Sequence, residues 1–297
     1  MSSFIGILLA TLTAILKSSS EILAKFTLLQ EVDEYVVSWA LRFFALPAII
    51  IGVFIFGVPD ISTKLWIAVA ITIPSSVAAT VLYMKAIQAS DLSVISPLAG
   101  ISPALVLLSS PFIVGEFPSV IGLVGVMTTT VGLYILKLHK ASAKHFFRPF
   151  KALVNEPGAR YMALMLIIYS LTAPIDKVGV EASSPVFYTF ITHLGQVLIL
   201  TLLMVKFSNE WKNIINKDRK KILAIGLLSG LSSIIQMTAL TFTLVVYVIS
   251  VKRAGILISV LAGHFIFKEE NIKERLLGAS IIISGLAIIA LTESGIM

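Results

Sequence analysis

The chain of 297 residues is too apolar to be a soluble domain. Hydrophobic residues make up 57% of it and charged residues 13%, whereas soluble domains carry about 25% charged residues. The mean hydropathy of +0.99 predicts an integral membrane protein. The net charge of +7 comes mainly from cations between apolar spans, so we interpret it as a topology signal and not as a surface for nucleic acid. Zero cysteines exclude disulfides, thiolate metal sites and cysteine nucleophiles.

The first apolar run, 4–26, has neither a basic leader nor a small-residue cleavage site, so we predict a membrane span and not a signal peptide. Further apolar runs follow, most of them separated by charged or turn-forming residues, and each has about the 20 residues that an α-helix needs to cross a bilayer. The predicted spans are 4–26, 36–57, 65–88, 92–114, 119–138, 161–178, 186–206, 222–243, 245–267 and 275–292. We therefore expect an all-α membrane protein with ten transmembrane helices.

The chain repeats itself at an offset of about 153 residues, without a gap. The identities at this offset include Met84 with Met237, Glu116 with Glu269, Gly125 with Gly278, and Gly132 with Gly285. We predict a first five-helix repeat at 1–138, a basic linker at 139–160 and a second five-helix repeat at 161–297. Because each repeat has an odd number of spans, the second copy must enter the membrane upside down. Inverted repeats are typical of secondary transporters, which bind solutes near the midplane between the copies.

Both halves carry an ordered set of charged and small residues. The set comprises Lys25, Arg42, Pro103, Gly115, Glu116, Gly125 and Gly132 in the first half, and Lys252, Arg253, Gly263, Lys268, Glu269, Gly278 and Gly285 in the second. This doubled set resembles the drug/metabolite transporter superfamily, and within it the EamA-like ten-helix carriers, over nearly the whole chain. The resemblance implies a carrier of small metabolites, amino acids or drugs that works by alternating access, often as an exporter.

A narrower resemblance concerns the adjacent cations of the ninth span. Lys252 and Arg253 look like the pair that grips phosphate in the plastid sugar-phosphate translocators of the same superfamily. Those relatives also carry a lysine four residues before a proline of the fourth span, where this chain has Ala99, four residues before Pro103. The resemblance therefore implies a general anionic or zwitterionic group and not phosphate in particular.

Intramembrane cations are the first candidates for substrate binding, because a charge on a lipid-facing helix surface is costly. Neighbours on a helix point about 100° apart, so only one of Lys252 and Arg253 could face a central cavity unless the helix is broken there. Alternatively, one of them snorkels to the interface or pairs with a carboxylate. Lys17 and Arg42 complete the cationic set, although Arg42 could instead be an interfacial anchor beside Trp39.

Two intramembrane residues are candidates for proton coupling. Glu21 shares a helix face with Lys17 at i, i+4, so it could handle protons, hold a substrate ammonium or form a self-neutralising pair. It could also be the counter-ion of Arg253. His193 lies in the seventh span, and its ordinary pKa of about 6.5 suits proton transfer. The alternative for His193 is a hydrogen-bonded packing residue.

Uncharged polar residues complete the candidate substrate site. Gln196 lies one turn after His193, and Tyr83 and Gln236 fall on the same repeat position, where both would line a central cavity. Helix–helix hydrogen bonding is the alternative for Gln236. We expect Asp176 to be the local partner of Lys177. Glu116 and Glu269, which end the fourth and ninth spans, are expected to be structural.

Five glycines of the fifth and tenth spans are predicted to allow close helix packing: Gly122, Gly125, Gly132, Gly278 and Gly285. The two spans that carry them are also a candidate surface for a homodimer. In the membrane, the positive-inside rule places the odd-numbered connections in the cytoplasm and both termini outside, because those connections hold nearly all the cations. Superfamily relatives usually have their termini inside, and both orientations stay open.

Together these features favour a secondary transporter in the cell membrane, with a small-molecule substrate and the lipid bilayer as its partners. The cavity cations outnumber the single anion Glu21, so we expect a small polar, acid-bearing solute such as an amino acid, and export of it. An intramembrane enzyme or a flippase acting on lipid-linked substrates is the alternative. We expect no enzyme, catalytic residue, metal site or cofactor, since no H-E-x-x-H motif, paired-aspartate motif or ATP-binding motif appears.

Overall fold

The computed structural model describes residues 2–27, 34–138, 147–208, 219–265 and 272–294. All regular secondary structure in these ranges is helical. By length and composition, nine of the described segments could cross a membrane, and the remaining predicted span, 245–267, is present as two shorter consecutive helices. The predicted all-α membrane fold is confirmed, and the pairing of equivalent helices from the two halves fits two inverted repeats.

The described part of the first repeat contains seven helices in five spans, because two of the spans consist of two helices each. They are α1 (Ser2–Thr27), α2 (Glu34–Phe43), α3 (Leu46–Phe56), α4 (Thr63–Ala89), α5 (Leu92–Ala99), α6 (Ser102–Val114) and α7 (Val120–Lys137). In the second repeat the order continues as α10 (Pro157–Glu181), α11 (Pro185–Phe207), α13 (Arg219–Leu240), α14 (Val245–Ala254), α15 (Ile256–Phe265) and α16 (Ile272–Ser294). The described part of the basic linker, from residue 147 on, contains the short helix α9 (Arg148–Asn155), which the sequence did not predict.

Three spans are broken into two helices, and two of the breaks follow from proline. The second span breaks before Pro47 and the fourth before Pro103, each of which lies in the first turn of the following helix. Proline cannot donate the backbone hydrogen bond that would continue a helix, and its ring clashes with the preceding turn. The ninth span breaks at Gly255 without a proline. This break lies close to the position that matches the fourth-span break in the repeat, so both copies carry a discontinuous helix at a similar depth.

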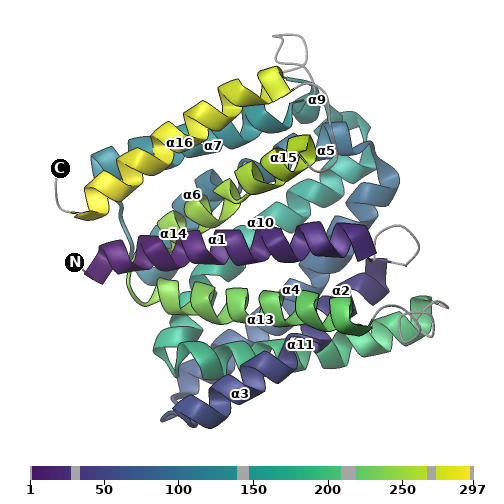
Figure 1. Ribbon diagram of the computed structural model, residues 1–297, viewed down its shortest axis with the longest axis vertical. Coiled ribbons are helices and arrows are strands. Elements are labelled where there is room, and N and C mark those ends of the chain that lie inside the picture. Colours follow the sequence, from purple (N-terminus) through teal and green to yellow (C-terminus); the bar gives the residue numbers. More distant parts are fainter. Residues whose placement is uncertain (1, 28–33, 139–146, 209–218, 266–271, 295–297) are drawn as a thin grey trace.

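The two repeats interlock through equivalent helix pairs. Helix α1 packs against α13, and α10 packs against α4, which are the same pair with the repeats exchanged. Helices α7 and α16 lie side by side at one edge (Figure 1) and are each other's counterparts in the two repeats. Early residues of α7 meet late residues of α16: Gly125 approaches Gly285 and Ile289, whereas Gly132 approaches Gly278 and Ile282. The counterpart helices are therefore antiparallel, as inverted repeats require.

The predicted role of the glycines in close helix packing is confirmed at the α7–α16 contact. A Cβ added to Gly132 would lie 2.7 Å from the backbone nitrogen of Ile282, and one added to Gly278 would lie 2.6 Å from the backbone of Leu136. Gly122 instead leaves room for the hydroxyl of Tyr247. The glycine faces are therefore used within one chain, and a homodimer stays a prediction.

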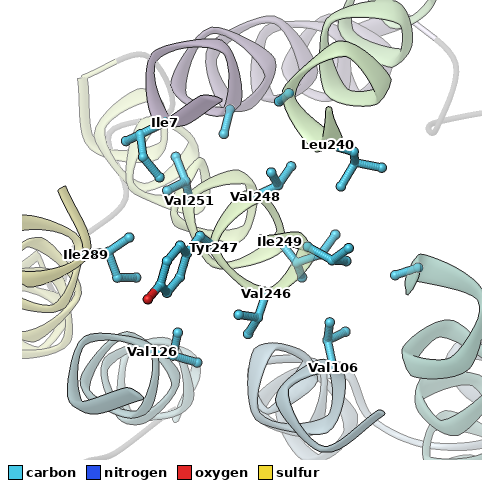
Figure 2. Close-up of a cluster of buried hydrophobic side chains, with 14 residues drawn as sticks. Ile7, Val106, Val126, Leu240, Val246, Tyr247, Val248, Ile249, Val251 and Ile289 are labelled. Atoms are coloured by element: carbon cyan, nitrogen blue, oxygen red, sulfur yellow. The ribbon is translucent and has the colours of Figure 1, made fainter. Parts of the chain in front are cut away.

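Helix α14 forms the centre of the bundle. Every residue from Val245 to Val251 is buried. Around it stand Ile7 of α1, Val106 of α6, Val126 of α7 and Ile289 of α16, with Tyr247 lying near Val126 and Ile289 (Figure 2). A helix that is apolar all round is one that other elements enclose. The cations at the end of α14 are thus held deep inside the protein and not at its lipid-facing surface.

Substituting Gly132 by alanine should destabilise the protein. The added methyl group would meet backbone atoms of α16, which cannot move aside as a side chain could, and overpacking of this kind costs about 1–3 kcal/mol. Thermal unfolding of the purified protein in detergent should therefore begin at a lower temperature. Val131→Ala, on the exposed face of the same helix, is the matched control, and equal stability of the two variants would contradict this packing.

Candidate functional site

A cavity of about 510 Å³ lies between the two repeats, within the range typical of small-molecule sites. Helices of both repeats line it. Among the described residues, five cationic side chains and two carboxylates reach its wall: Lys17, Arg42, Lys137, Lys252 and Arg253, with Glu21 and Asp176. Intramembrane charges usually mark a solute or ion pathway, so this cavity is the candidate functional site.

The cavity lies toward one end of the bundle. Tyr83 and Lys137, in its wall, lie near the C-terminal ends of α4 and α7, and Met165 lies near the N-terminal end of α10. The basic linker connects α7 to α10, so the cavity lies toward the end that carries this linker. The N-terminal end of α1 and the C-terminal end of α16 lie together at the opposite end (Figure 1).

The two adjacent cations lie directly before the break at Gly255. Lys252 and Arg253 form the last turn of α14, and both side chains line the cavity. Because both belong to one regular helix, their side chains point about 100° apart, and the cavity wall takes in both directions. Ile256, the first residue of α15, also lines the cavity. The N-terminal end of a half-helix carries partial positive charge and suits an anionic solute group.

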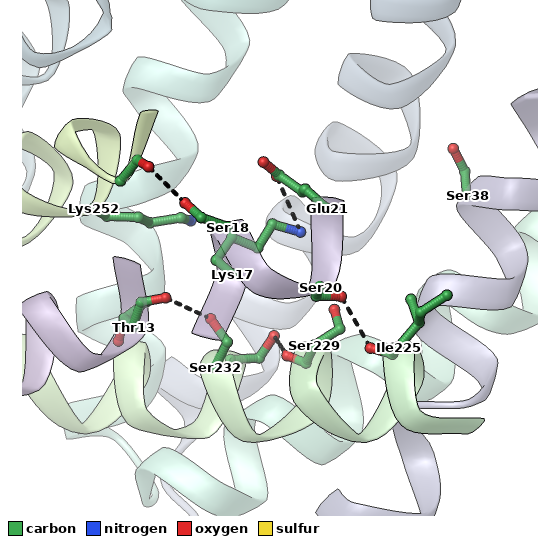
Figure 3. Close-up of polar contacts among 12 residues, drawn as sticks. Thr13, Lys17, Ser18, Ser20, Glu21, Ser38, Ile225, Ser229, Ser232 and Lys252 are labelled. Carbon is green, nitrogen blue, oxygen red and sulfur yellow. Dashed lines mark hydrogen bonds and ion pairs between the residues drawn. The ribbon is translucent and has the colours of Figure 1, made fainter. Parts of the chain in front are cut away.

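A hydrogen bond joins the first repeat to the break at Gly255. Ser18 of α1 donates its hydroxyl to the carbonyl oxygen of Gly255 at 2.8 Å (Figure 3). A Cβ at Gly255 would lie 2.7 Å from the Ser18 hydroxyl oxygen and 3.0 Å from the Ala14 carbonyl oxygen. Only glycine therefore allows α1 to approach this closely.

Lys252 and Arg253 have different surroundings. The Nζ of Lys252 donates to the amide oxygen of Gln236 at 2.5 Å. The guanidinium of Arg253 lies over the ring of Tyr169, 4.9 Å from its centre. Within the part of the chain that the structure describes, the Nε of Arg253 and the hydroxyl of Tyr169 are buried without a hydrogen-bond partner. Unpaired buried polar groups are costly, so a solute that bonds to them would be stabilised.

Arg42 is directed into the cavity by three acceptors on three helices. Its Nε donates to the amide oxygen of Gln196 at 2.6 Å, and its two terminal nitrogens donate to the Ser38 carbonyl at 3.1 Å and the Thr80 hydroxyl at 3.2 Å. Trp39 instead donates to the Thr201 hydroxyl. The alternative of an interfacial anchor beside Trp39 is therefore wrong, because a network of side chains holds Arg42 inside the protein.

The remaining predicted site residues divide into those that line the cavity and those that support it. Tyr83 reaches the wall, as predicted. Gln196 and Gln236 do not reach it, and each holds a cation, Arg42 or Lys252, by its amide oxygen. Helix–helix hydrogen bonding, the alternative for Gln236, is what the structure shows. Their direct contact with substrate stays a prediction.

The two proton-coupling candidates differ in position. Glu21 lines the cavity and forms an ion pair with Lys17, 3.7 Å between Oε1 and Nζ (Figure 3). Among the described contacts, Glu21 does not pair with Arg253. His193 lies outside the cavity wall, and its Nδ1 lies 3.0 Å from the Thr189 carbonyl oxygen on the same helix. This contact with its own helix matches the packing alternative, and a role in proton coupling stays a prediction.

Sequence reasoning missed a carboxylate and a tyrosine on one face of α10. Tyr169, Thr172 and Asp176 line the cavity at helical spacing. Asp176 is not the partner of Lys177: its Oδ1 accepts from the Tyr188 hydroxyl at 2.8 Å and the Thr72 hydroxyl at 3.3 Å. The spacing of polar residues along this span was the available signal. Lys137, at the end of the fifth span, was also missed.

Lys177 closes the opposite end of the bundle. Its Nζ lies 2.5 Å from Oε1 of Glu116 and donates to the Thr243 carbonyl at 3.1 Å. The other carboxylate oxygen of Glu116 accepts from the backbone N–H of Val245 at 2.8 Å, at the start of α14. The predicted structural role of Glu116 is confirmed, because it ties the ends of α6, α10 and α14 together. Glu269 lies outside the described residues.

The chain belongs to the EamA-like transporter family, which matches it twice, at residues 4–138 and 157–291. The family is one of membrane transporters of small solutes, consistent with the drug/metabolite transporter superfamily that the sequence resembles. A solved crystal structure is similar to the chain with a TM-score of 0.74, at 14% identity and with 98% of each chain covered. At that identity the likeness shows the fold alone. A search of curated protein sequences gave no match.

The ion pair of Glu116 predicts which end of the cavity is sealed. Because the chain has no cysteine, a single cysteine in place of Thr172 in the cavity wall can be labelled selectively with an impermeant thiol reagent. Labelling in oriented vesicles should occur from the side of the basic linker only. Adding Glu116→Gln removes the charge that holds Lys177, and labelling from the opposite side should rise several-fold.

Glu181→Gln is the matched control for this experiment. Glu181 also faces Lys177, at 4.0 Å, but its side chain is exposed, and exposed ion pairs contribute little. Its substitution should leave the labelling pattern unchanged. Equal labelling from both sides before any charge is removed, or no effect of Glu116→Gln, would contradict the assignment of the sealed end.

Proposed function

We propose that the protein is a secondary transporter that moves a small polar, acid-bearing solute by alternating access. The observation that carries this proposal is the cavity between the repeats, whose wall holds, among the described residues, five cationic side chains but only two carboxylates. An excess of buried positive charge is costly unless an anion compensates it. An amino acid or an organic acid supplies such an anion, and both fit a cavity of about 510 Å³.

The arrangement of the cations supports recognition of a carboxylate. Arg253 offers a planar guanidinium, whose Nε lacks a protein partner among the described residues, and Lys252 offers a point charge beside it. Arg42 is held by three acceptors and contributes a fixed positive charge from the first repeat. Since these groups come from both copies, a solute held between them would be bound at the interface that moves during alternating access.

We also propose export across the cell membrane. The cavity lies toward the end that carries the basic linker, and the positive-inside rule assigns such connections to the cytoplasm. A solute would then load from the cytoplasm while the Glu116–Lys177 pair closes the outer end. Breakage of that pair and closure of the inner end would release the solute outside.

Transport of a labelled amino acid in counterflow tests this function. Liposomes that contain the purified protein and unlabelled amino acid should accumulate the labelled one, and Lys252→Ala should reduce the rate roughly ten-fold or more, as expected for loss of a hydrogen bond to a charged group. Lys64→Ala removes an exposed lysine at the start of α4, outside the cavity, and should keep the full rate.

No counterflow with any member of a panel of amino acids and organic acids, or full activity of Lys252→Ala, would refute the proposal. A chemically altered product would favour the alternative of an intramembrane enzyme. Movement of lipid-linked substrates alone would favour a flippase.

A further inference from the structure

We propose that Asp176 forms a second subsite of the cavity, which takes the ammonium group of a zwitterionic solute whose acid group lies at the cations of α14. This inference rests on the proposed transport function and narrows the substrate class to amine-bearing acids. It makes Asp176 a specificity-determining residue, which distinguishes an amino acid from a hydroxy acid of the same carbon skeleton.

The first support is the hydrogen bonding of the Asp176 carboxylate. Both of its protein donors, the hydroxyls of Tyr188 and Thr72, reach the same oxygen, Oδ1, at 2.8 and 3.3 Å. Among the described contacts, Oδ2 has no donor, and the residue lines the cavity. Tyr188 is itself buried, and its hydroxyl oxygen lies 2.9 Å from the Thr72 hydroxyl oxygen. The carboxylate is therefore fixed by one oxygen and leaves the other available to a ligand.

The second support is the lack of a counter-ion for this carboxylate. The neighbouring Lys177 points to Glu116 and the Thr243 carbonyl. Lys252 also lines the cavity, but its Nζ bonds to Gln236, and Lys252 and Asp176 do not form an ion pair in the described structure. An ionised carboxylate inside a membrane protein normally has a cationic partner. An ammonium group from the solute would supply it.

The third support is the arrangement of groups along α10. Tyr169, Thr172 and Asp176 lie on one face of this helix, all in the cavity wall. Arg253 stacks on the ring of Tyr169, and the hydroxyl of Tyr169 is buried without a partner among the described residues. This face therefore runs from the cationic end of the site to the carboxylate, with a free hydroxyl between them. A solute with both an acid and an ammonium group would complement Arg253, the Tyr169 hydroxyl and Asp176, whereas a simple anion would leave the charge of Asp176 uncompensated.

The test compares pairs of solutes that differ only in an ammonium or a hydroxyl group. In proteoliposomes, each solute is offered as a competitor of the counterflow of a labelled amino acid. The pairs are alanine and lactate, aspartate and malate, and phenylalanine and phenyllactate. In at least one pair, the amino acid should inhibit counterflow by the native protein more strongly than the hydroxy acid does. Asp176→Asn should reduce that preference roughly ten- to hundred-fold, the range expected for a hydrogen bond between charged groups.

Asparagine retains a carbonyl oxygen that can accept from Tyr188 and Thr72, so Asp176→Asn removes the charge while keeping the structural contacts. Because the readout is a ratio of two competitors, a lower yield of folded protein does not affect it. Asp176→Glu, which restores the charge, should recover part of the preference. Asp60→Asn, in the exposed connection between α3 and α4, is the matched control and should behave as the native protein.

An unchanged preference in Asp176→Asn would overturn the subsite, as would an equal loss for both members of every pair, which would assign Asp176 a structural or proton-carrying role. Counterflow by the native protein without any preference for the amine would also overturn it, while leaving the proposed transport function intact. If the native protein shows no counterflow of the labelled amino acid, the result would count against both the subsite and the proposed transport function.

Discussion

The structure depends on the interruption of one helix, in the ninth span, inside the bundle. The ninth span stops at Ala254, turns at Gly255 and starts again at Ile256. The hydroxyl of Ser18, from the first repeat, donates a hydrogen bond of 2.8 Å to the carbonyl oxygen of Gly255. This carbonyl also accepts from the backbone N–H of Ile258 at 3.0 Å, in the first turn after the break, so Ser18 is its second donor. The bond from Ser18 joins the two repeats at the level of the cavity.

The cationic side of the site lies next to this interruption. The last turn of α14, directly before it, presents both Lys252 and Arg253 to the cavity. Amides set back from the cavity wall then orient the cations, with Gln236 on Lys252 and Gln196 on Arg42. The buried first half of α14 anchors this arrangement in the core (Figure 2).

Helix α10 connects the cavity to the sealed end. Asp176 lies in the cavity wall, and the next residue, Lys177, belongs to the cluster that ties Glu116 and the start of α14 together. A displacement of α10 would therefore alter the solute site and the closed end at the same time. Such coupling would suit the alternating access that we propose.

Hydropathy and the internal repeat predicted the spans, because burial in lipid imposes a length and an apolar composition that single sequences display. The charged wall was also predictable in part, since Lys17, Glu21, Arg42, Lys252 and Arg253 stand out in apolar spans. The break at Gly255 was not, because no proline marks it and the close approach of α1 that requires glycine is a tertiary contact.

The partner of Asp176 was assigned to its sequence neighbour Lys177, but helix neighbours point apart, and the orientation of α10 against α4 and α11 decides otherwise. Gln196 and Gln236 were predicted to line the cavity for a similar reason. The sequence shows that they are polar and central, but not that each binds a cation, Arg42 or Lys252, which reaches the cavity wall in its place.

The most direct measurement is an experimental structure of the purified protein in lipid nanodiscs. We expect Lys252 and Arg253 both to face a water-filled hollow between the two repeats, with Gly255 bonded to Ser18 at the break. A structure in which both side chains point to acyl chains or bulk water, with no hollow between the copies, would contradict the central claim.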